Sequence, residues 1–393
     1  MSGPLQGLRV LEMGQLIAGP FCGQLLADMG AEVIKIELPG QGDPMREWGR
    51  GAPVWWPVIG RNKKCITLDV RAARGLALMQ DLIARADVWV ENFRPGTLER
   101  WGLGYDVLAN INPRLVLVRV SGYGQDGPYS SRAGYGGIGE AMGGLRYVCG
   151  DPSAAPSRVG ISIGDSLAAM FATIGCLAAL QQRERSGVGQ VVDSAIYESV
   201  LAVMESTVPE FTVGGVIRER TGSVLPGIAP SNVYPTADGQ MIVMGANQDS
   251  VFRRLCAAMG REELADDPRY CNHGARASHQ QELDDLIAAW TRQQGAEPLL
   301  AKLEEGGVPA GKMFRAPDML TDPQYQARQS IVAVAHEKFQ NLMMQNVFPK
   351  FSATPGEVRW PGAAMGAHNQ EIFGDLLGLD AGAMESLRAE GVI

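Results

Sequence analysis

Short apolar strands and amphipathic helices alternate along the first part of the chain. Residues 8–12 (Leu-Arg-Val-Leu-Glu) are typical of a strand, residues 20–30 begin with proline and end with glycine as helices often do, and residues 32–37 predict a second strand. A strand, a helix and a strand in this order form a βαβ unit, whose crossover is expected to be right-handed.

The same alternation continues beyond this unit. A helix is expected over residues 72–86, and further strands are expected at 65–68, 87–90 and 115–120. Alternating strands and helices predict an α/β domain with an open, mostly parallel, Rossmann-like sheet.

The pattern changes near residue 214, where a stretch rich in glycine and proline (222–230) indicates a domain boundary. Residues 234–244 then predict two strands joined by a turn. Helical stretches are expected at 249–259, 279–292 and 297–305. These elements predict a small α+β domain. A C-terminal apolar segment around Phe373 predicts a helix that packs back on a larger body.

Composition excludes several classes of protein. The chain has 393 residues, a formal net charge of −8 and 46% hydrophobic residues. An acidic chain with no basic run longer than residues 61–64 lacks the electrostatic surface that nucleic acids bind. The longest apolar helical stretch, 166–180, is shorter than the ~20 residues that span a bilayer, and residues 1–4 do not resemble the start of a signal peptide. We expect a cytoplasmic protein that binds neither nucleic acid nor membrane.

The six cysteines include no Cys-x-x-Cys pair and lie in apolar segments. Buried, free thiols in a reducing compartment are therefore expected rather than disulfides or metal ligands. The four histidines are far apart in the sequence and form no His-Glu-x-x-His motif, so no metal site is expected.

One formal motif belongs to a different enzyme class. Residues 160–164 (Gly-Ile-Ser-Ile-Gly) match the nucleophile elbow of α/β-hydrolases. That elbow needs an apolar strand directly before the serine, whereas residues 151–158 are polar and rich in proline. A hydrolase is therefore disfavoured. The first strand–helix turn also lacks the Gly-x-Gly-x-x-Gly spacing of dinucleotide-binding sites.

Asp165 opens the apolar helical stretch that follows this motif. One interpretation is a helix N-cap, whose carboxylate accepts hydrogen bonds from the first free N–H groups. The other is a nucleophile, because the helix dipole keeps a carboxylate ionised at this position. The local pattern alone favours the cap.

A second polar cluster directly follows a predicted strand, at residues 91–96 (Glu-Asn-Phe-Arg-Pro-Gly), with Arg100 one turn further on. Open α/β sheets bind ligands at the carboxyl ends of their strands. An amide, an aromatic ring and two guanidinium groups suit a ligand with phosphates and a stackable ring. A solvated loop with a satisfied asparagine explains the same residues equally well.

Taken together, these segments resemble the family III CoA-transferases, which include formyl-CoA transferase and the carnitine CoA-transferases. The resemblance rests on the order and spacing of segments along nearly the whole chain: 8–12 with 18–20, 33–37 with 42–43, 62–64, 90–96, 121–124 with 127–129, 164–165 and 366–369. It places Asp165 at the position of the catalytic aspartate of that family. It implies that this carboxylate attacks an acyl-CoA thioester, so that an aspartyl anhydride and then an aspartyl-CoA thioester form before an acceptor carboxylate takes the CoA.

The resemblance also implies which residues bind CoA, which is a substrate here and not a tightly bound cofactor. The implied CoA contacts are Ile17, Ala18, Leu68, Arg71, Asn92, Phe93, Arg94, Arg100 and Arg132. The glycines at 136, 137, 139, 143 and 144 are candidate backbone donors to an oxyanion. Leu38 stands where the family often has a basic residue near the adenine, which puts that contact in doubt.

The identity of the substrates is less constrained. The small domain lacks the multiple-glycine loop of formyl-CoA transferase, and its residues 228–248 look closer to members that take CoA from succinyl-CoA. A second carboxylate would bind an arginine, for which Arg46 and Arg220 are candidates. Arg46, Tyr135 and Glu140 are the candidate substrate contacts.

The alternative function is that of the α-methylacyl-CoA racemases, which share this fold. They place a histidine where this chain has Tyr135, so one of their two acid/base groups is missing here.

The family fold is an interlocked homodimer, in which each chain forms a ring through which the other passes. Its large domain is built from both ends of the chain. By this resemblance residues 1–215 and 330–393 form the large CoA-binding domain, and residues 216–329 form the small domain with its linkers.

Overall fold

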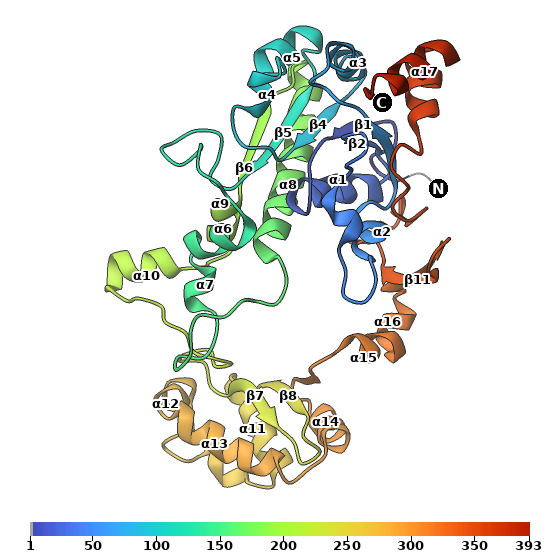
Figure 1. Ribbon diagram of the computed structural model, residues 1–393. Coiled ribbons are helices and arrows are strands. Elements are labelled where there is room, and N and C mark those ends of the chain that lie inside the picture. Colours follow the sequence, from blue (N-terminus) through green and yellow to red (C-terminus); the bar gives the residue numbers. More distant parts are fainter. Residues whose placement is uncertain (1–2) are drawn as a thin grey trace. The chain divides into compact units, whose positions relative to one another are not determined.

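The computed structural model describes residues 3–393, which form two compact units (Figure 1). The large unit contains the N-terminal part through Arg146, Val159–Thr207 and Gln326–Ile393. The middle unit contains Tyr147–Arg158 and Val208–Tyr325. The two ends of the chain therefore belong to one unit, and the segment Tyr147–Arg158 groups with the middle of the chain.

A six-stranded, fully parallel sheet forms the centre of the large unit, in the order β3-β2-β1-β4-β5-β6. The strands are β1 (Arg9–Glu12), β2 (Glu32–Glu37), β3 (Lys63–Thr67), β4 (Val88–Glu91), β5 (Val116–Ser121) and β6 (Val191–Ala195). The α/β class and the Rossmann-like sheet expected from the sequence are confirmed. The pattern did not indicate β6, whose first three residues are partly or fully exposed and therefore form no apolar run.

Helices cover both faces of this sheet, and each face has its own apolar core. On one face α3 (Ala73–Ile83), α5 (Tyr105–Ile111) and α17 (Ala381–Ala389) pack on the strands. On the other face α1 (Ala18–Asp28) and α8 (Ile163–Ser186) do so. The remaining elements of this unit are η1 (Pro44–Glu47), α2 (Trp55–Ile59), α4 (Thr97–Arg100), α6 (Gly136–Met142), α9 (Ile196–Leu201), the antiparallel pair β10 (Ile331–His336) and β11 (Gln340–Gln345), the π-helix η3 (Gln370–Leu376), the first residue of α10 (Thr207–Gly214), the last two residues of α16 (Pro323–Ala327) and the first two residues of α7 (Leu145–Val148).

Helix α8 is longer than the apolar stretch expected at 166–180, because it continues through the polar residues before Gly187. Among residues 3–393 it is the one helix that is long and apolar enough to match a membrane span, and half of its apolar stretch is buried. Ala168, Ala172 and Cys176 pack on the sheet. The core of the unit therefore accounts for the apolar character of this helix.

The sheet reverses its direction of growth between β1 and β4. The chain moves from β1 outward to β2 and β3, and then returns to place β4 on the other side of β1. Loops that leave neighbouring strands on opposite sides of the sheet open a crevice at this point, where ligands of open α/β proteins bind. The loops after β1 and β4 therefore mark the expected site.

The C-terminal segment is fastened to the edge strand β3. The N–H of Cys65 donates to Nδ1 of His368 (3.0 Å), and the N–H of His368 donates to the carbonyl of Cys65 (3.0 Å). The amide of Asn369 accepts from the N–H of Thr67 (2.9 Å) and donates to its hydroxyl (2.8 Å). Phe373 then packs into the apolar core, so the predicted return of this segment to a larger body is confirmed.

The middle unit has a three-stranded antiparallel sheet, which was expected as two strands. Its strands are β7 (Ser231–Pro235), β8 (Met241–Gly245) and β9 (Ala310–Lys312). Its helices are α11 (Asp249–Met259), η2 (Glu262–Ala265), α12 (His273–Ser278), α13 (Gln280–Thr291), α14 (Ala296–Glu305) and α15 (Ala316–Thr321), with most of α10 and of α16.

All six cysteines are free, and four of them are buried. Burial raises the pKa of Cys22 and of Cys65 to about 12, so neither thiol is a nucleophile at neutral pH. The expectation of burial is wrong for Cys271, which is exposed in a polar loop, and Cys149 is half-buried.

Protonation of His368 is expected to loosen the C-terminal segment. Burial lowers the pKa of this imidazole below its ordinary 6.5, and a protonated ring cannot accept the Cys65 N–H. Its contribution to stability is therefore present above pH 6.5 and lost as the pH falls below that value. We expect His368→Gln to lower the free energy of unfolding at pH 8 by about 1 kcal/mol, and the difference from the unmodified protein to shrink at pH 5. Urea titrations at both pH values measure this. The exposed His273→Gln is the control, and a difference that does not depend on pH contradicts the account.

Candidate active site

Two cavities lie at the reversal point of the sheet in the large unit. The first, here the Asp165 cavity, has a volume of about 160 Å³ and is lined by Gln15, Leu16, Ile17, Ala18, Asn92, Val120, Ser121, Gly122, Gly134, Tyr135, Gly136, Asp165 and Ile196. The second, here the Arg71 cavity, measures about 140 Å³ and is lined by Met13, Gly14, Gln15, Lys35, Ile36, Glu37, Leu38, Gly42, Asp43, Leu68, Asp69, Val70, Arg71, Phe93 and Trp101. Gln15 lines both cavities, so they adjoin along the loop that follows β1.

Asp165 lies in the first turn of α8. The helix begins at Ile163 after Ser162, so Asp165 is its third residue and the N-cap interpretation is wrong. No strand precedes Ser162 in the segment 149–162, so the hydrolase elbow does not form. A helix N-terminus favours the ionised carboxylate. Asp165 is half-buried and lines the cavity, which leaves its carboxylate within reach of a ligand.

Gly136 leaves room for this carboxylate. A Cβ atom at Gly136 would lie 2.2 Å from Oδ2 of Asp165, so any side chain at this position displaces the carboxylate. Gly139 in α6 and Gly143 directly after it serve packing instead, because a Cβ at either position would lie within 2.6 Å of a side chain of α9.

The expected oxyanion role is wrong for three of the five glycines. The N–H groups of Gly139, Gly143 and Gly144 already donate to the backbone carbonyls of Tyr135, Gly139 and Ala141, respectively. They are therefore not available to an oxyanion.

The candidate substrate contacts Tyr135 and Glu140 have different surroundings. Tyr135 lines the Asp165 cavity and is 59% exposed. The carboxylate of Glu140 is buried, accepts from Nε of Arg146 (2.8 Å) and faces the N–H of Gly164 (3.4 Å). Glu140 therefore links α6 to the start of α8, directly beside Asp165.

Asn92 holds the loop that follows β1. Its side-chain oxygen accepts from the N–H of Gln15 (2.8 Å), and its side-chain nitrogen donates to the carbonyl of Gln15 (2.9 Å). Asn92, Ile17 and Ala18 all line the Asp165 cavity. The structure therefore brings these three expected CoA contacts together, and it uses the Asn92 amide to fix the loop.

The Arg71 cavity contains three further expected CoA contacts, Leu68, Arg71 and Phe93. The guanidinium of Arg71 is 56% exposed and pairs with Asp69 (2.7 Å). The ring of Phe93 meets Trp101 edge to face, with centroids 5.0 Å apart. An aromatic face and an exposed cation in one cavity suit a nucleotide with phosphates. Leu38 lines the same cavity, where the family often has a basic residue.

The other arginines lie outside both cavities. Arg94, Arg100 and Arg132 are exposed, and the guanidinium of Arg132 stacks 3.7 Å from the ring centroid of Tyr129. Arg46 pairs with Glu37 (2.5 Å) and stacks on Trp56, so its charge is already compensated. Arg220 belongs to the middle unit, where it contacts Tyr147.

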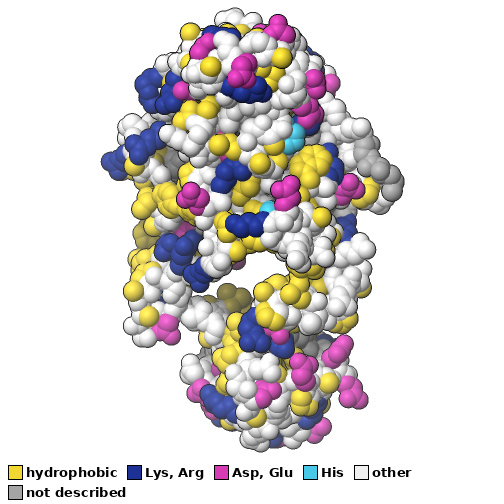
Figure 2. Space-filling view, turned by 45° about the vertical axis from the view of Figure 1, so that its right-hand side comes forward, with side chains coloured by type: hydrophobic (Ala, Val, Ile, Leu, Met, Phe, Trp, Pro, Cys, Tyr) yellow, Lys and Arg dark blue, Asp and Glu magenta, His cyan; other side chains and the backbone are white. Residues whose placement is uncertain are grey.

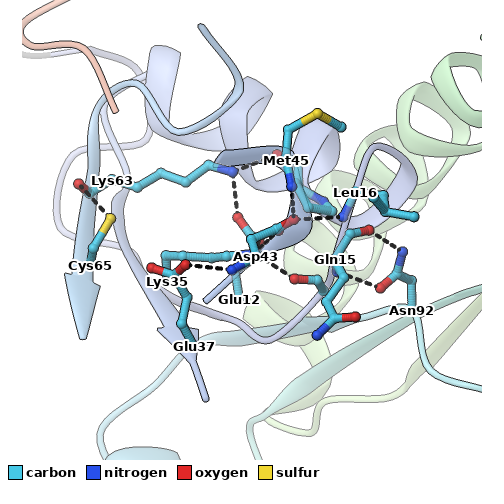
Figure 3. A network of polar contacts seen from close by, with 12 residues as sticks. Glu12, Gln15, Leu16, Lys35, Glu37, Asp43, Met45, Lys63, Cys65 and Asn92 are labelled. Carbon is cyan, nitrogen blue, oxygen red and sulfur yellow. Dashed lines mark hydrogen bonds and ion pairs between the residues drawn. The ribbon is translucent and has the colours of Figure 1, made fainter. Parts of the chain in front are cut away.

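A buried ion cluster lies under the loop after β1 (Figure 3). Nζ of Lys35 binds Glu12 (2.9 Å), Asp43 (2.8 Å) and the carbonyl of Gly14 (2.5 Å). Burial alone would lower the pKa of Lys35, but the charges of Glu12 and Asp43 outweigh burial and raise it. Burial alone would raise the pKa of Asp43, but the charge of Lys35 outweighs burial and lowers it. Both groups are therefore charged.

Sequence reasoning missed Gln15, Ser121, Lys35 and Asp43. Ser121 ends a buried strand and Gln15 lies in the first strand–helix turn, so their positions at carboxyl ends of strands were the available signal. Lys35 gave none, because a lysine inside an apolar strand is recognisable as buried only once its partners are known. In the part of the chain from residue 3 onward, no group of three or more metal-ligating side chains is arranged to hold an ion.

Comparison with known proteins decides the family. The model of CoA-transferase family III matches residues 5–369. The chain belongs to this family. It is 59% identical, over 99% of this chain and 98% of the relative, to succinyl-CoA–D-citramalate CoA-transferase of Chloroflexus aurantiacus. It is 38% identical, over 99% and 98%, to the beta subunit of succinyl-CoA–L-malate CoA-transferase from the same organism.

A solved structure agrees with the sequence matches. The crystal structure of a CaiB/BaiF family protein from Brucella suis superposes with a TM-score of 0.86 at 32% identity, covering 96% of this chain and all of that one. The resemblance inferred from the sequence is confirmed. The protein is a CoA-transferase, which moves CoA from an acyl-CoA to a carboxylic acid. These matches favour the transferase over the racemase alternative.

We expect Gly136→Ala to reduce the rate of CoA transfer by about 10²-fold, because a methyl group would displace the Asp165 carboxylate. Gly137→Ala is the matched control, since its Cβ would meet only the flexible end of Arg146, at 3.3 Å. Steady-state rates and melting temperatures of both variants measure the effect. Equal rates in the two variants would contradict the proposed contact.

Proposed function

We propose that this enzyme transfers CoA from succinyl-CoA to D-citramalate, a hydroxylated dicarboxylate. The 59% identity over the full length of both chains supports these substrates. The observation that carries the chemistry is the placement of Asp165, on the first turn of α8 and in the wall of a cavity that adjoins a second, aromatic- and arginine-lined cavity.

The proposed reaction begins when an Asp165 oxygen attacks the thioester carbon of succinyl-CoA. The C–S bond breaks, and a succinyl-aspartyl anhydride and CoA thiolate form. The thiolate then attacks the aspartyl carbon of the anhydride, which releases succinate and leaves an aspartyl-CoA thioester. The acceptor carboxylate then attacks the aspartyl carbon of this thioester, which releases CoA thiolate and forms a citramalyl-aspartyl anhydride. The thiolate attacks the citramalyl carbon of this anhydride, and the bond from that carbon to the Asp165 oxygen breaks. Citramalyl-CoA leaves, and the Asp165 carboxylate is regenerated.

We propose that CoA lies across both cavities. Its nucleotide occupies the Arg71 cavity at Leu68, Arg71 and Phe93, and its thioester reaches the Asp165 cavity beside Ile17 and Ala18. The exposed Arg94, Arg100 and Arg132 would attract its phosphates. Figure 2 shows basic side chains interspersed with acidic ones on the face drawn, so the net charge of −8 does not make that face uniformly negative.

Tyr135 is the proposed contact for the acceptor, because its exposed side chain lines the cavity that holds Asp165. Glu140 would act indirectly, by holding the start of α8. The guanidinium of Arg46 is bound to Glu37 and lines a different cavity, which makes it the weaker candidate for the second carboxylate.

We further propose a cytoplasmic homodimer. On the outer side of α8, Met170, Phe171 and Ile174 are 39%, 37% and 61% exposed, and a second copy of the chain would remove them from water. A partner of a different sequence is the alternative, because one relative is named as a beta subunit. The free cysteines agree with a reducing compartment.

An acceptor series tests the substrates. With succinyl-CoA as donor, we expect D-citramalate to give the highest kcat/KM, above L-citramalate, L-malate, glutarate and formate. Chromatographic detection of each CoA ester measures the products. Transfer to formate but to none of the dicarboxylates would contradict the proposed substrates, yet would leave the transferase chemistry intact.

We expect Asp165→Ala to lower kcat by at least about 10³-fold, because alanine has no carboxylate to form the covalent intermediates. Asp81→Ala, which removes an exposed carboxylate from α3, is the control. Circular dichroism verifies the folding of both variants. Substantial transfer by Asp165→Ala would overturn the mechanism.

A further inference from the structure

The loop after β1 is shared by the two cavities. Met13, Gly14 and Gln15 line the Arg71 cavity, and Gln15 through Ala18 line the Asp165 cavity. Any displacement of this loop therefore changes both walls at once.

The loop contains an unfavourable backbone conformation. Leu16 has a φ of 63°, in the left-handed region that residues other than glycine and asparagine rarely adopt. Such a conformation persists only where surrounding contacts determine it.

Three buried or half-buried side chains hold the backbone of this loop on consecutive residues. Lys35 donates to the carbonyl of Gly14 (2.5 Å), Asn92 binds both polar backbone groups of Gln15, and Oδ1 of Asp43 accepts from the N–H of Leu16 (3.1 Å). Asp43 also accepts from the N–H of Met45 (3.0 Å), which fixes the carboxylate itself at the start of η1.

The charge of Lys35 joins these contacts into one cluster. Its ammonium binds Asp43 directly, and the second carboxylate, Glu12, also pairs with Lys63 (2.5 Å). Lys35, Asp43, Glu12 and Lys63 are each at most 2% exposed. Buried ion pairs at this density cost desolvation and are poor sources of net stability, so their placement under one strained loop points to a role in geometry.

We propose that Lys35 and Asp43 are positioning residues for CoA transfer. They hold Gly14 and Leu16, so that the loop keeps the walls of both cavities at fixed positions relative to Asp165. This role rests on the proposed placement of acyl-CoA across the two cavities. The cluster acts through the loop, and the reacting atoms need not contact it.

Asp43→Asn tests the role, because an asparagine oxygen can still accept an N–H but no longer attracts Lys35. We expect kcat/KM for succinyl-CoA to fall tenfold or more, and amide hydrogen exchange of a peptide spanning residues 13–18 to become faster. Asp28→Asn is the matched control, since Asp28 is equally buried and charge-paired, with Arg61 (2.6 Å), but does not touch the loop. We expect this control to lower the melting temperature and to leave kcat/KM within twofold.

Two results would overturn the proposal. The first is unchanged kcat/KM in Asp43→Asn. The second is an equal loss in both variants, which would assign the effect to general stability. If Asp43→Asn does not fold, Asp43→Ser gives the same comparison, with a loss of tenfold or more expected, because serine also lacks the charge that attracts Lys35. Asp165→Ala separates this test from the proposed function, because transfer by that variant would contradict the mechanism whatever the loop does.

Discussion

A buried ammonium group bridges two carboxylates at the point where the parallel sheet changes its direction of growth, and a second lysine, Lys63, pairs with one of them. Lys35 projects from β2, Glu12 ends β1, and Asp43 lies in the loop after β2. Removing one partner of such a cluster leaves an uncompensated buried charge, which costs about 3–5 kcal/mol. The cluster therefore fixes the relative positions of the strand ends from which the site is built. The fully buried carboxylate of Glu12 also explains why α1 has Gly23 beside it, since a Cβ there would lie against that carboxylate.

The site places each part of the chemistry on a rigid element. Asp165, the proposed nucleophile, lies on the first turn of a 24-residue helix, whose dipole favours the ionised form of a carboxylate. Gly136 gives the carboxylate room, and Glu140 ties the two helices together beside it. The loop after β1 connects this arrangement to the cavity with Phe93 and Arg71. A thioester bound across the loop would thus be held by contacts remote from the reacting carbon, which is how binding energy lowers the barrier of a transfer reaction.

Much of this architecture was predictable from the sequence, because buried parallel strands form apolar runs. Strand β6 was missed because Val191 and Asp193 are exposed, so that the strand forms no apolar run. The local pattern assigned Asp165 to an N-cap, and only its place in the family pattern indicated catalysis. The sequence left two roles open for Asn92, a ligand contact and a satisfied asparagine in a loop. The structure agrees with both, because Asn92 lines the Asp165 cavity and its amide is hydrogen-bonded to Gln15. The pairing of Arg46 with Glu37 and the cluster at Lys35 depend on contacts between strands that no local pattern encodes.

The central claim is that Asp165 carries the acyl group and then CoA as a covalent adduct. Hydroxylamine converts an activated aspartyl carbonyl to a hydroxamate, so the most direct measurement is tandem mass spectrometry of the enzyme quenched with hydroxylamine during turnover of succinyl-CoA. The account predicts a hydroxamate on Asp165, absent without succinyl-CoA and absent in Asp165→Asn. Turnover with Asp165 unmodified, or a hydroxamate on another carboxylate, would contradict it.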